Sequence, residues 1–145
     1  MQITSRFTIA VHAMLCITHF SRTLKVTSGF IAGSVNTNPV VIRRILGQLK
    51  EAGLVRVEAG ISGASLAKAP ENITLLDIFN AVECVEGSLF HFHEAPNPQC
   101  PVGRSIHAVL DDTLEDIQCT LENRLAQTTL LDMENKVLSS VQAEQ

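Results

Sequence analysis

Apolar residues recur at intervals of three and four along the first part of the chain, which is the period of an amphipathic α-helix. The pattern predicts a first helix over residues 5–20, with Thr4 or Ser5 as its N-cap. A short second helix is expected to begin at Thr27 or Ser28, where a hydroxyl can accept a hydrogen bond from an open backbone N–H. The chain is therefore expected to start with two helices joined by a short connection.

A third helix is predicted from Pro39 to about Ala52, because Asn38 is a favourable N-cap and proline suits the first helical position. Gly53 is a natural stop for this helix. Its apolar stripe consists of Val41, Ile42, Ile45, Leu46 and Leu49. Its opposite face carries Arg43, Arg44, Gln48 and Lys50. One side of the helix is thus expected to pack into a core, and the other side to make polar contacts.

The period changes after the third helix, and alternating β-branched residues predict a hairpin. We expect the first strand over 54–57, a glycine-containing turn over 59–63 and the return strand over 65–67. Two helices at a tight turn followed by a hairpin form the pattern of a winged helix-turn-helix, in which the hairpin is the wing.

The second half of the chain predicts a fourth helix over 75–82, a loop over 86–101 and a long helix over about 102–128. The long helix carries apolar residues in a rhythm typical of a helix that pairs with another helix: Leu110, Leu114, Ile117, Leu121 and Leu125. We expect homodimerisation through this seam, because a helix of ~38 Å is longer than so small a domain covers. Packing against its own domain is the alternative. Residues 130–145 are expected to form a frayed polar tail.

The predicted fold class is mainly α with a small β-hairpin, organised in three parts. These are a winged helix-turn-helix DNA-binding domain over 1–70, the fourth helix and a sensor loop over 71–101, and the dimerisation helix and C-terminal tail over 102–145. The chain has no apolar run near the ~20 residues of a membrane helix and no signal-peptide pattern, so we expect a cytoplasmic protein without membrane contact.

The formal net charge of −4 is the sum of two oppositely charged parts. Residues 1–69 carry eight basic and two acidic residues, a net charge of +6, whereas residues 70–145 carry three basic and 13 acidic residues, a net charge of −10. Such asymmetry indicates a nucleic-acid module joined to a second unit. Since Trp and Tyr are absent, stacking on single strands is not expected, and double-stranded DNA is the expected partner.

The basic residues of the third helix are candidate DNA contacts. An arginine can donate two hydrogen bonds to guanine O6 and N7 in the major groove. Two adjacent helix residues cannot both point squarely into the groove, so we assign base reading to Arg43 and phosphate contact to Arg44 and Lys50. Arg56, in the first wing strand, is the candidate for the minor groove. A solvated surface charge is the alternative for each residue.

Cys100 is the candidate redox-sensing residue among four cysteines. It stands at the expected N-cap of the long helix, where the helix N-terminus and Arg104 would stabilise a thiolate and so favour oxidation. An inert capping cysteine is the alternative. The other three cysteines, Cys16, Cys84 and Cys119, fall on expected packing faces, where cysteine behaves as a small hydrophobe.

No metal or cofactor is predicted. The loop before the long helix holds one cysteine, which is too few for an iron–sulfur cluster. His91, His93, Cys100 and His107 match no metal-ligand spacing, and surface histidines are the simpler interpretation.

Five segments, in order along the chain, resemble one family: SRFTIAVHAML, NPVVIRRILGQLKEAGLV, the glycine-containing turn, ITLLDIFNAVE and NPQCPVG. Over residues 2 to about 128 the chain resembles the Rrf-two-type winged-helix regulators, which include the repressors IscR, NsrR and CymR, and it is most similar to the cluster-free branch described as YwnA-like. The resemblance implies a cytoplasmic bacterial homodimer that binds a palindromic operator. Each third helix would enter a major groove, and each wing would reach the neighbouring minor groove.

The resemblance also implies which positions contact DNA. Asn38 and Pro39 would begin the recognition helix, with Arg43 and Arg44 on its next turn. Thr27 and Ser28 would place the second helix N-terminus at a phosphate, and the wing tip would be Gly60, Ile61, Ser62 and Gly63. Many members have consecutive glycines in the wing, so the approach of this wing to the minor groove is expected to differ. Cysteine-sensing branches use a cysteine at the position of Cys100.

The function predicted from these features is that of a DNA-binding transcriptional repressor that responds to thiol oxidation. A protein–protein interaction module on the same scaffold is one alternative, and a regulator that responds to a small molecule without redox chemistry is another. An enzyme is not expected, because the sequence shows no nucleophile–base pair, phosphate-binding loop or metal motif.

Overall fold

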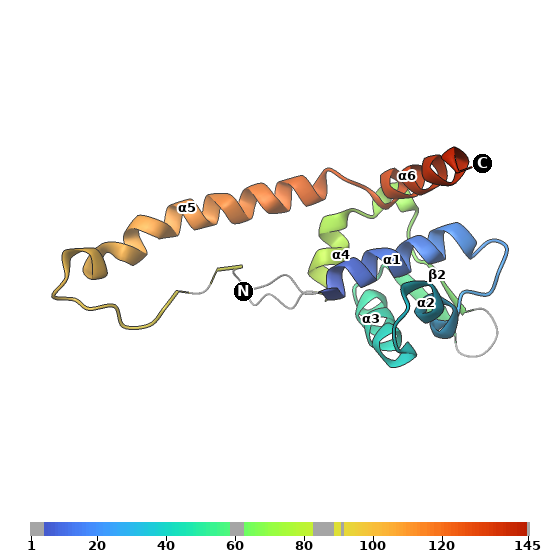
Figure 1. The fold of residues 1–145 in the computed structure, drawn as a ribbon, viewed down its shortest axis with the longest axis horizontal. Coiled ribbons are helices and arrows are strands. Elements are labelled where there is room, and N and C mark those ends of the chain that lie inside the picture. The colour runs from blue at the N-terminus through green and yellow to red at the C-terminus, as the bar shows by residue number, and fades with distance from the viewer. Residues whose placement is uncertain (1–4, 59–62, 83–88, 91, 145) are drawn as a thin grey trace.

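A computed structural model describes residues 5–58, 63–82, 89–90 and 92–144 of the chain. The elements are α1 (Ser5–Phe20), α2 (Ser28–Val35), α3 (Pro39–Glu51), β1 (Val55–Glu58), β2 (Gly63–Leu66), η1 (Pro70–Asn72), α4 (Leu75–Val82), α5 (Pro101–Ala126) and α6 (Leu130–Ala143). Helices α1 to α4, the hairpin and α6 form one body, and α5 extends from it as a long arm (Figure 1). The predicted fold class, mainly α with a winged helix-turn-helix, is confirmed.

Side-chain caps and one left-handed residue set the turn between α2 and α3. Thr27 caps α2 by accepting a hydrogen bond from the backbone N–H of Phe30, at 3.1 Å. Asn36 ends α2 with a φ of 66°, a conformation that asparagine tolerates better than most residues. Asn38 then caps α3 by accepting from the N–H of Val40, at 2.9 Å. The cap predicted at Asn38 is therefore confirmed, and of the two candidates Thr27 and Ser28 the cap of α2 is Thr27.

A single core joins α1, α3, α4, the first wing strand and α6. The predicted apolar stripe of α3 faces this core: Ile42, Ile45, Leu46 and Leu49 are at most 5% exposed, and Val41 packs against them. The largest fully buried side chains are Met14, Ile17, Ile31, Ile42, Ile45, Leu49, Leu54, Ile73, Ile78 and Leu130.

The wing is a two-stranded antiparallel hairpin in which Val55 pairs with Leu66 and Glu58 with Gly63. The strands lie one or two residues away from the predicted 54–57 and 65–67. Leu54 links α3 to the hairpin: its N–H donates to the carbonyl of Leu49 at 3.0 Å, and its own carbonyl accepts from the N–H of Ala67 at 3.0 Å. Residues 59–62 lie outside the described residues, and with them the predicted wing-tip contacts Gly60 and Ser62.

The C-terminal segment corrects the sequence prediction, because residues 130–143 form the helix α6 rather than a frayed tail. Thr129 and Asp132 make a capping box, with Asp132 N–H donating to the Thr129 hydroxyl at 3.1 Å and Thr129 N–H donating to the Asp132 carboxylate at 2.9 Å. The backbone and hydroxyl of Thr129 lower the pKa of Asp132. Leu130 is fully buried and anchors the helix in the core. The prediction was wrong because it rested on the polar composition of this segment and overlooked Leu130 as an apolar anchor and Thr129 as a cap.

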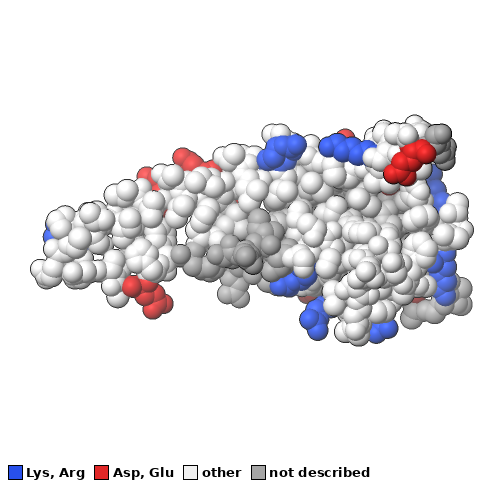
Figure 2. All heavy atoms as spheres, in the orientation of Figure 1, with Lys and Arg blue, Asp and Glu red and all other residues white. Residues whose placement is uncertain are grey.

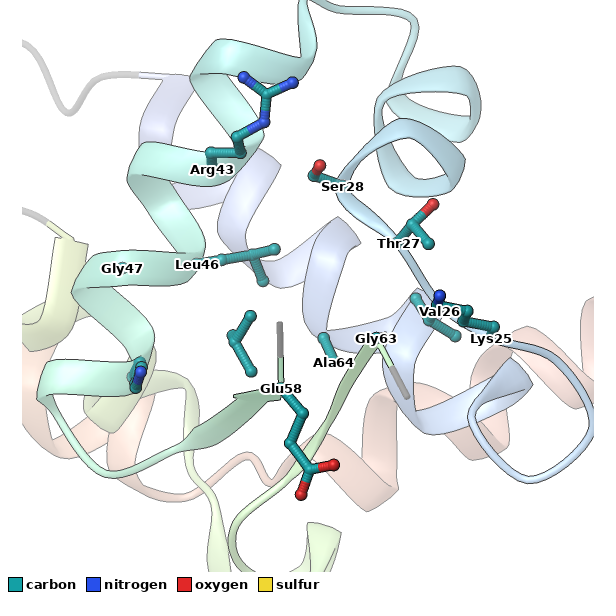
Figure 3. Close-up of a pocket in the computed structure, with 12 residues that line it drawn as sticks. Lys25, Val26, Thr27, Ser28, Arg43, Leu46, Gly47, Glu58, Gly63 and Ala64 are labelled. Carbon is teal, nitrogen blue, oxygen red and sulfur yellow. The ribbon is translucent and has the colours of Figure 1, made fainter. Parts of the chain in front are cut away.

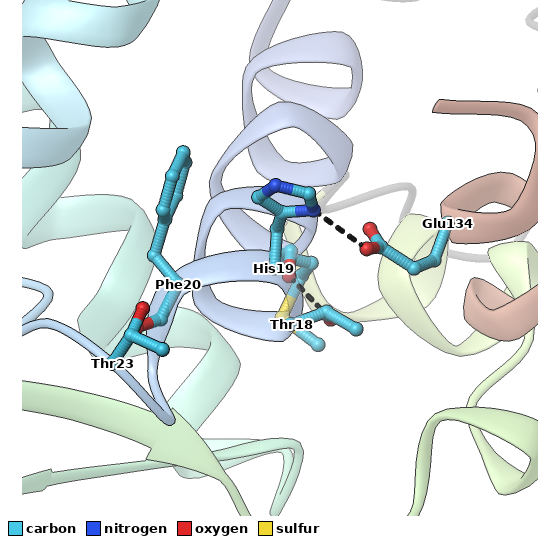
Figure 4. Close-up of polar contacts among 6 residues, drawn as sticks. Thr18, His19, Phe20, Thr23 and Glu134 are labelled. Carbon is cyan, nitrogen blue, oxygen red and sulfur yellow. Dashed lines mark hydrogen bonds and ion pairs between the residues drawn. The ribbon is translucent and has the colours of Figure 1, made fainter. Parts of the chain in front are cut away.

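A side-chain hydrogen bond between distant parts of the sequence helps to hold α6 against α1 (Figure 4). His19 on α1 and Glu134 on α6 contact each other through Nδ1 and Oε1 at 2.8 Å, and Glu134 is only 8% exposed. Two backbone hydrogen bonds bring the start of α6 to the start of α4: Leu130 N–H donates to Ile73 at 2.8 Å, and Leu75 N–H donates to Thr128 at 2.9 Å.

Helix α5 has no buried residue, although it is the longest helix, with 26 residues. At 1.5 Å per residue it measures about 39 Å, and most of this length lies beyond the body (Figure 1). Of its predicted seam, Ile117 is 48% exposed and Leu110, Leu114, Leu121 and Leu125 are half-buried in the single chain. None of the helices in the described part of the chain is long and apolar enough to cross a membrane.

Candidate nucleic-acid interface

A groove of about 490 Å³ lies between α3, the N-terminus of α2 and the wing (Figure 3). Its floor is apolar and comes from two elements: Leu46 and Gly47 on α3, and Ala64 on β2. Lys25, Arg43 and Lys50 line it with positive charge, and Glu58 lines it with one negative charge. A groove with an apolar floor and an excess of cationic side chains along its sides suits a sugar–phosphate strand.

Arg43 lies at the opening of this groove. It extends from α3 on one side, and Thr27 and Ser28 lie on the other side, at the start of α2 (Figure 3). Lys50 follows Arg43 by two helical turns on the same face of α3, so one stripe of the helix carries both cations. The sequence predicted these four residues as DNA contacts, and the structure brings them together around one hollow.

The wing is fastened to the start of α2 by backbone contacts. Gly63 forms a parallel bridge with Val26, and the N–H of Ala64 donates to the Val26 carbonyl at 2.8 Å. Gly63 has a φ of 68°, and a Cβ atom placed there would lie 2.5 Å from the Val26 carbonyl oxygen. Only glycine therefore allows the two segments to approach this closely. The width of the groove depends on this contact, since Val26 and Gly63 both line it.

The remaining predicted contacts lie around the groove rather than in it. Arg44 is exposed on α3, on the neighbouring face to Arg43. Arg56 is exposed on β1, opposite Ser65, and points to the other face of the strand from Val57, which lines the groove. Asn38 and Pro39 stand at the start of α3 as cap and first residue.

Sequence reasoning missed Lys25, Val40 and the role of Gly63. Lys25 precedes the predicted second helix and showed no pattern, because only the folded wing brings it beside the groove. Val40 belongs to neither the predicted apolar stripe nor the predicted polar face of α3, and its side chain is 52% exposed. For Gly63 the available signal was its place in a turn, but its partner Val26 is 37 residues away, and turn chemistry cannot identify such a partner.

The distribution of charge follows the division predicted from the sequence. In Figure 2 basic side chains lie along the edge of the body where α3 is drawn in Figure 1, and acidic side chains lie along α5. The α3 face thus presents positive charge to a polyanion, whereas the α5 arm repels one.

Cys100 is exposed and occupies the N-cap position of α5, with Pro101 as the first helical residue. Its side chain makes no capping hydrogen bond. Arg104 donates its backbone N–H to the Cys100 carbonyl at 2.9 Å, in the first turn of the helix. Cys16 is buried as predicted, but Cys119 is exposed, because the face of α5 that carries it has no cover within one chain. Cys84 lies outside the described residues.

The histidines near Cys100 show ring contacts. His107 stacks on Phe92 with ring centroids 4.4 Å apart, and His93 lies 6.1 Å from His107. His91 lies outside the described residues. Within the described part of the chain, no three His, Cys, Asp or Glu side chains are placed to hold a metal ion together.

Comparison with known proteins identifies relatives along nearly the whole chain. Residues 3–136 match the Rrf2 (Rrf-two) family, described as iron-dependent transcriptional regulators. YwnA of Bacillus subtilis (strain 168), named as an HTH-type transcriptional regulator, is 47% identical over 133 residues, which are 92% of this chain and 97% of YwnA. These relatives are transcriptional regulators and not enzymes.

Solved structures give the same picture. A crystal structure assigned to a DNA-binding protein is 41% identical, with a TM-score of 0.70, and the match covers 89% of this chain and 98% of that one. The structure of CymR, the global cysteine regulator of B. subtilis, has the same fold, with a TM-score of 0.69 at 22% identity over 93% of this chain and 97% of that one.

Proposed function

Because the chain belongs to the Rrf2 family of transcriptional regulators, which bind DNA, we propose that it is a cytoplasmic, homodimeric repressor of a palindromic operator. The observation that carries the proposal is the groove between α3 and the wing, lined by Lys25, Arg43 and Lys50. These cations belong to the part of the chain with a net charge of +6. A repressor acts by occupying its operator, so its affinity and its selectivity both depend on this surface.

In the proposed complex α3 enters the major groove of DNA and the wing lies over the adjacent minor groove. Arg43, at the opening of the groove, reads guanine through two hydrogen bonds. Arg44 and Lys50 meet phosphates, which gives affinity without sequence choice. The DNA strand between the two grooves then runs through the hollow between α3 and the wing. The N-terminus of α2, at Thr27 and Ser28, offers backbone N–H groups to a phosphate there.

The dimer would form along α5. A helix of 26 residues without a buried side chain is unusual in an isolated domain, and its apolar stripe from Leu110 to Leu125 has the spacing of a helix pair. We expect wild-type protein to run as a dimer in light scattering, and Leu114→Asp to run as a monomer, because a charge in the seam loses hydration without a partner. Val109→Asp is the control, since Val109 is 64% exposed on the outer side of the helix. A Leu114→Asp protein that stays dimeric would exclude this seam.

Salt dependence of DNA binding tests the proposed function. Purified protein is used to select duplexes from a random pool, and the affinity for the selected duplex is measured by fluorescence anisotropy between 50 and 200 mM salt, a span over which phosphate contacts weaken binding strongly. With Arg44 and Lys50 acting in both copies, four phosphate contacts give a slope of log K against log salt of about −3.6 or steeper. Failure to select any duplex, or a slope near zero, would contradict DNA binding and favour a protein–protein interaction module.

The proposed signal is oxidation of the Cys100 thiol. Its support is the exposed sulfur at a helix N-terminus, in the first turn before Arg104. A peroxide would oxidise the thiolate to a sulfenic acid and would itself be reduced to water. We expect peroxide to weaken operator binding by wild type and Cys119→Ser, but not by Cys100→Ser. Equal loss in all three proteins would assign the effect elsewhere, and no loss in any would favour a small-molecule signal without redox chemistry.

We further propose that the protein works without an iron–sulfur cluster. The loop before α5 supplies Cys100 as its one cysteine, whereas a cluster needs several ligands close together. Protein purified without oxygen should therefore lack visible absorbance and contain no stoichiometric iron. A coloured protein with two or more iron atoms per chain would refute this.

A further inference from the structure

Val40 is an exposed apolar side chain on a helix whose other apolar residues face the core. The other apolar residues of α3 either lie in the core, at most 5% exposed, or, like Val41, pack against it. Val40 is 52% exposed and does not belong to the core. Its exposure is therefore a departure from the pattern that organises the rest of the helix.

The position of Val40 places it on the face that carries the basic residues. Arg43 and Arg44 follow it by three and four residues, so they are its neighbours on the helix surface, with Cβ atoms about 5–6 Å apart. Val40 is also in the first turn of α3, and it is the N-terminal part of a recognition helix that reaches base edges.

The local structure does not require valine here. The cap uses the backbone N–H of Val40, which donates to Asn38 at 2.9 Å, and any residue except proline would supply this group. Valine is moreover a weaker helix former than alanine, because its branched side chain loses χ1 freedom against the preceding turn. An exposed valine thus contributes nothing to the helix that alanine would not contribute better.

We propose that Val40 reads the C5-methyl group of thymine in the major groove. The inference rests on the proposed DNA binding through α3. Thymine alone among the four bases presents a methyl group there, and apolar side chains are its natural partners. The cytosine edge offers an N4–H donor instead, which valine would bury without an acceptor.

The geometry also predicts where the thymine lies. Arg43 and Val40 are one helical turn apart, about 5–6 Å, and successive bases rise by about 3.4 Å. The thymine read by Val40 therefore lies one or two base pairs from the guanine read by Arg43, once in each half of a palindrome.

The experiment replaces single thymines by deoxyuridine, which removes only the methyl group, in a duplex that the wild-type protein selected from a random pool. Affinities are compared for wild type, Val40→Ala, Val40→Thr and Val141→Ala. Val141 is a matched control because it is 45% exposed on α6, away from α3. Thermal unfolding of each variant checks that it folds, and Val40→Ala is expected to be at least as stable as wild type.

Wild type should lose about fourfold in affinity when the one contacted thymine of either half-site is replaced, the factor expected for one buried methyl group. Val40→Ala changes both half-sites, so it should bind the thymine duplex about 15-fold more weakly, and it should not distinguish thymine from deoxyuridine at that position. Val40→Thr keeps one methyl and should retain part of the discrimination, and Val141→Ala should behave as wild type.

Two results would overturn the inference while leaving DNA binding intact. One is a wild-type protein that tolerates deoxyuridine at every thymine of the duplex. The other is a Val40→Ala protein that keeps the same deoxyuridine sensitivity as wild type. A wild-type protein that selects no duplex at all would instead refute the proposed function, so the two failures are distinguishable.

Discussion

Replacing Gly63 by alanine should both destabilise the protein and open the groove that we assign to DNA. The perturbation is a single methyl group at the point where the wing meets the start of α2. Its Cβ would lie 2.5 Å from the Val26 carbonyl oxygen and within 3.0 Å of two further backbone atoms of Val26. Because all three are backbone atoms, the clash cannot be relieved by turning a side chain, and the two segments must separate.

The magnitude follows from two costs. Alanine in the left-handed region, at a φ of 68°, costs about 1–2 kcal/mol relative to glycine. Separation also breaks the hydrogen bond from Ala64 N–H to the Val26 carbonyl, at 2.8 Å, with a net loss of about 1 kcal/mol. We therefore expect the free energy of unfolding to fall by about 2–3 kcal/mol.

Urea unfolding followed by circular dichroism, at one fixed protein concentration, measures this loss. Gly33→Ala is the matched control, because Gly33 lies in α2 with nothing within 4 Å of the added Cβ and no positive φ. That substitution should stabilise the protein by roughly 0.5–1 kcal/mol. A Gly63→Ala protein with an unchanged urea midpoint would refute the reasoning, as would an equal loss in both variants. The affinity for the selected duplex should fall only in Gly63→Ala.

Three further predictions concern other parts of the molecule. Arg43→Ala should lower the ratio of specific to non-specific DNA affinity by a factor equivalent to about 1–3 kcal/mol per half-site, and an unchanged ratio would contradict its base-reading role. Arg44→Ala should weaken both affinities and reduce the magnitude of the salt slope by about 1.8, because both copies lose one phosphate contact. Leu130→Ala should lower the free energy of unfolding by about 2–5 kcal/mol, because its side chain is fully buried. Leu131→Ala, at 36% exposure, should lower it by under about 1 kcal/mol in the same urea assay. Equal losses would mean that α6 is not anchored through Leu130. The pKa of Asp132 is lowered by its hydrogen bonds to Thr129, so its stabilisation of α6 is present above the unfolded pKa of about 3.9 and is lost as pH falls through the lower folded pKa. Asp132→Asn should therefore lower the free energy of unfolding at pH 7 but not near pH 2. A difference that stays constant with pH would contradict the capping role.

Much of the fold could be predicted because its signals are local. The caps at Thr27 and Asn38, the proline after Asn38 and the apolar stripe of α3 are short-range features, and each lies where the sequence placed it. The Arg43 and Lys50 stripe was predictable for the same reason, since helical spacing alone puts two residues seven apart on one face. The frayed tail was a wrong prediction because α6 depends on long-range contacts, with Leu130 in the core and Glu134 against His19.

The sequence by itself determined the order of elements, the family and the separation of basic from acidic residues, because caps, periodicity and charge are properties of neighbouring residues. Only the tertiary structure decided which residues share the groove. Val26 and Gly63 meet through backbone atoms that any residue carries, so no side-chain pattern announces the contact. Likewise, the exposure of Val40 follows from the way α3 lies on the core, and not from any property of valine. Local sequence therefore determines which face of each helix is polar, but the approach of distant backbone segments determines the surface that a partner contacts.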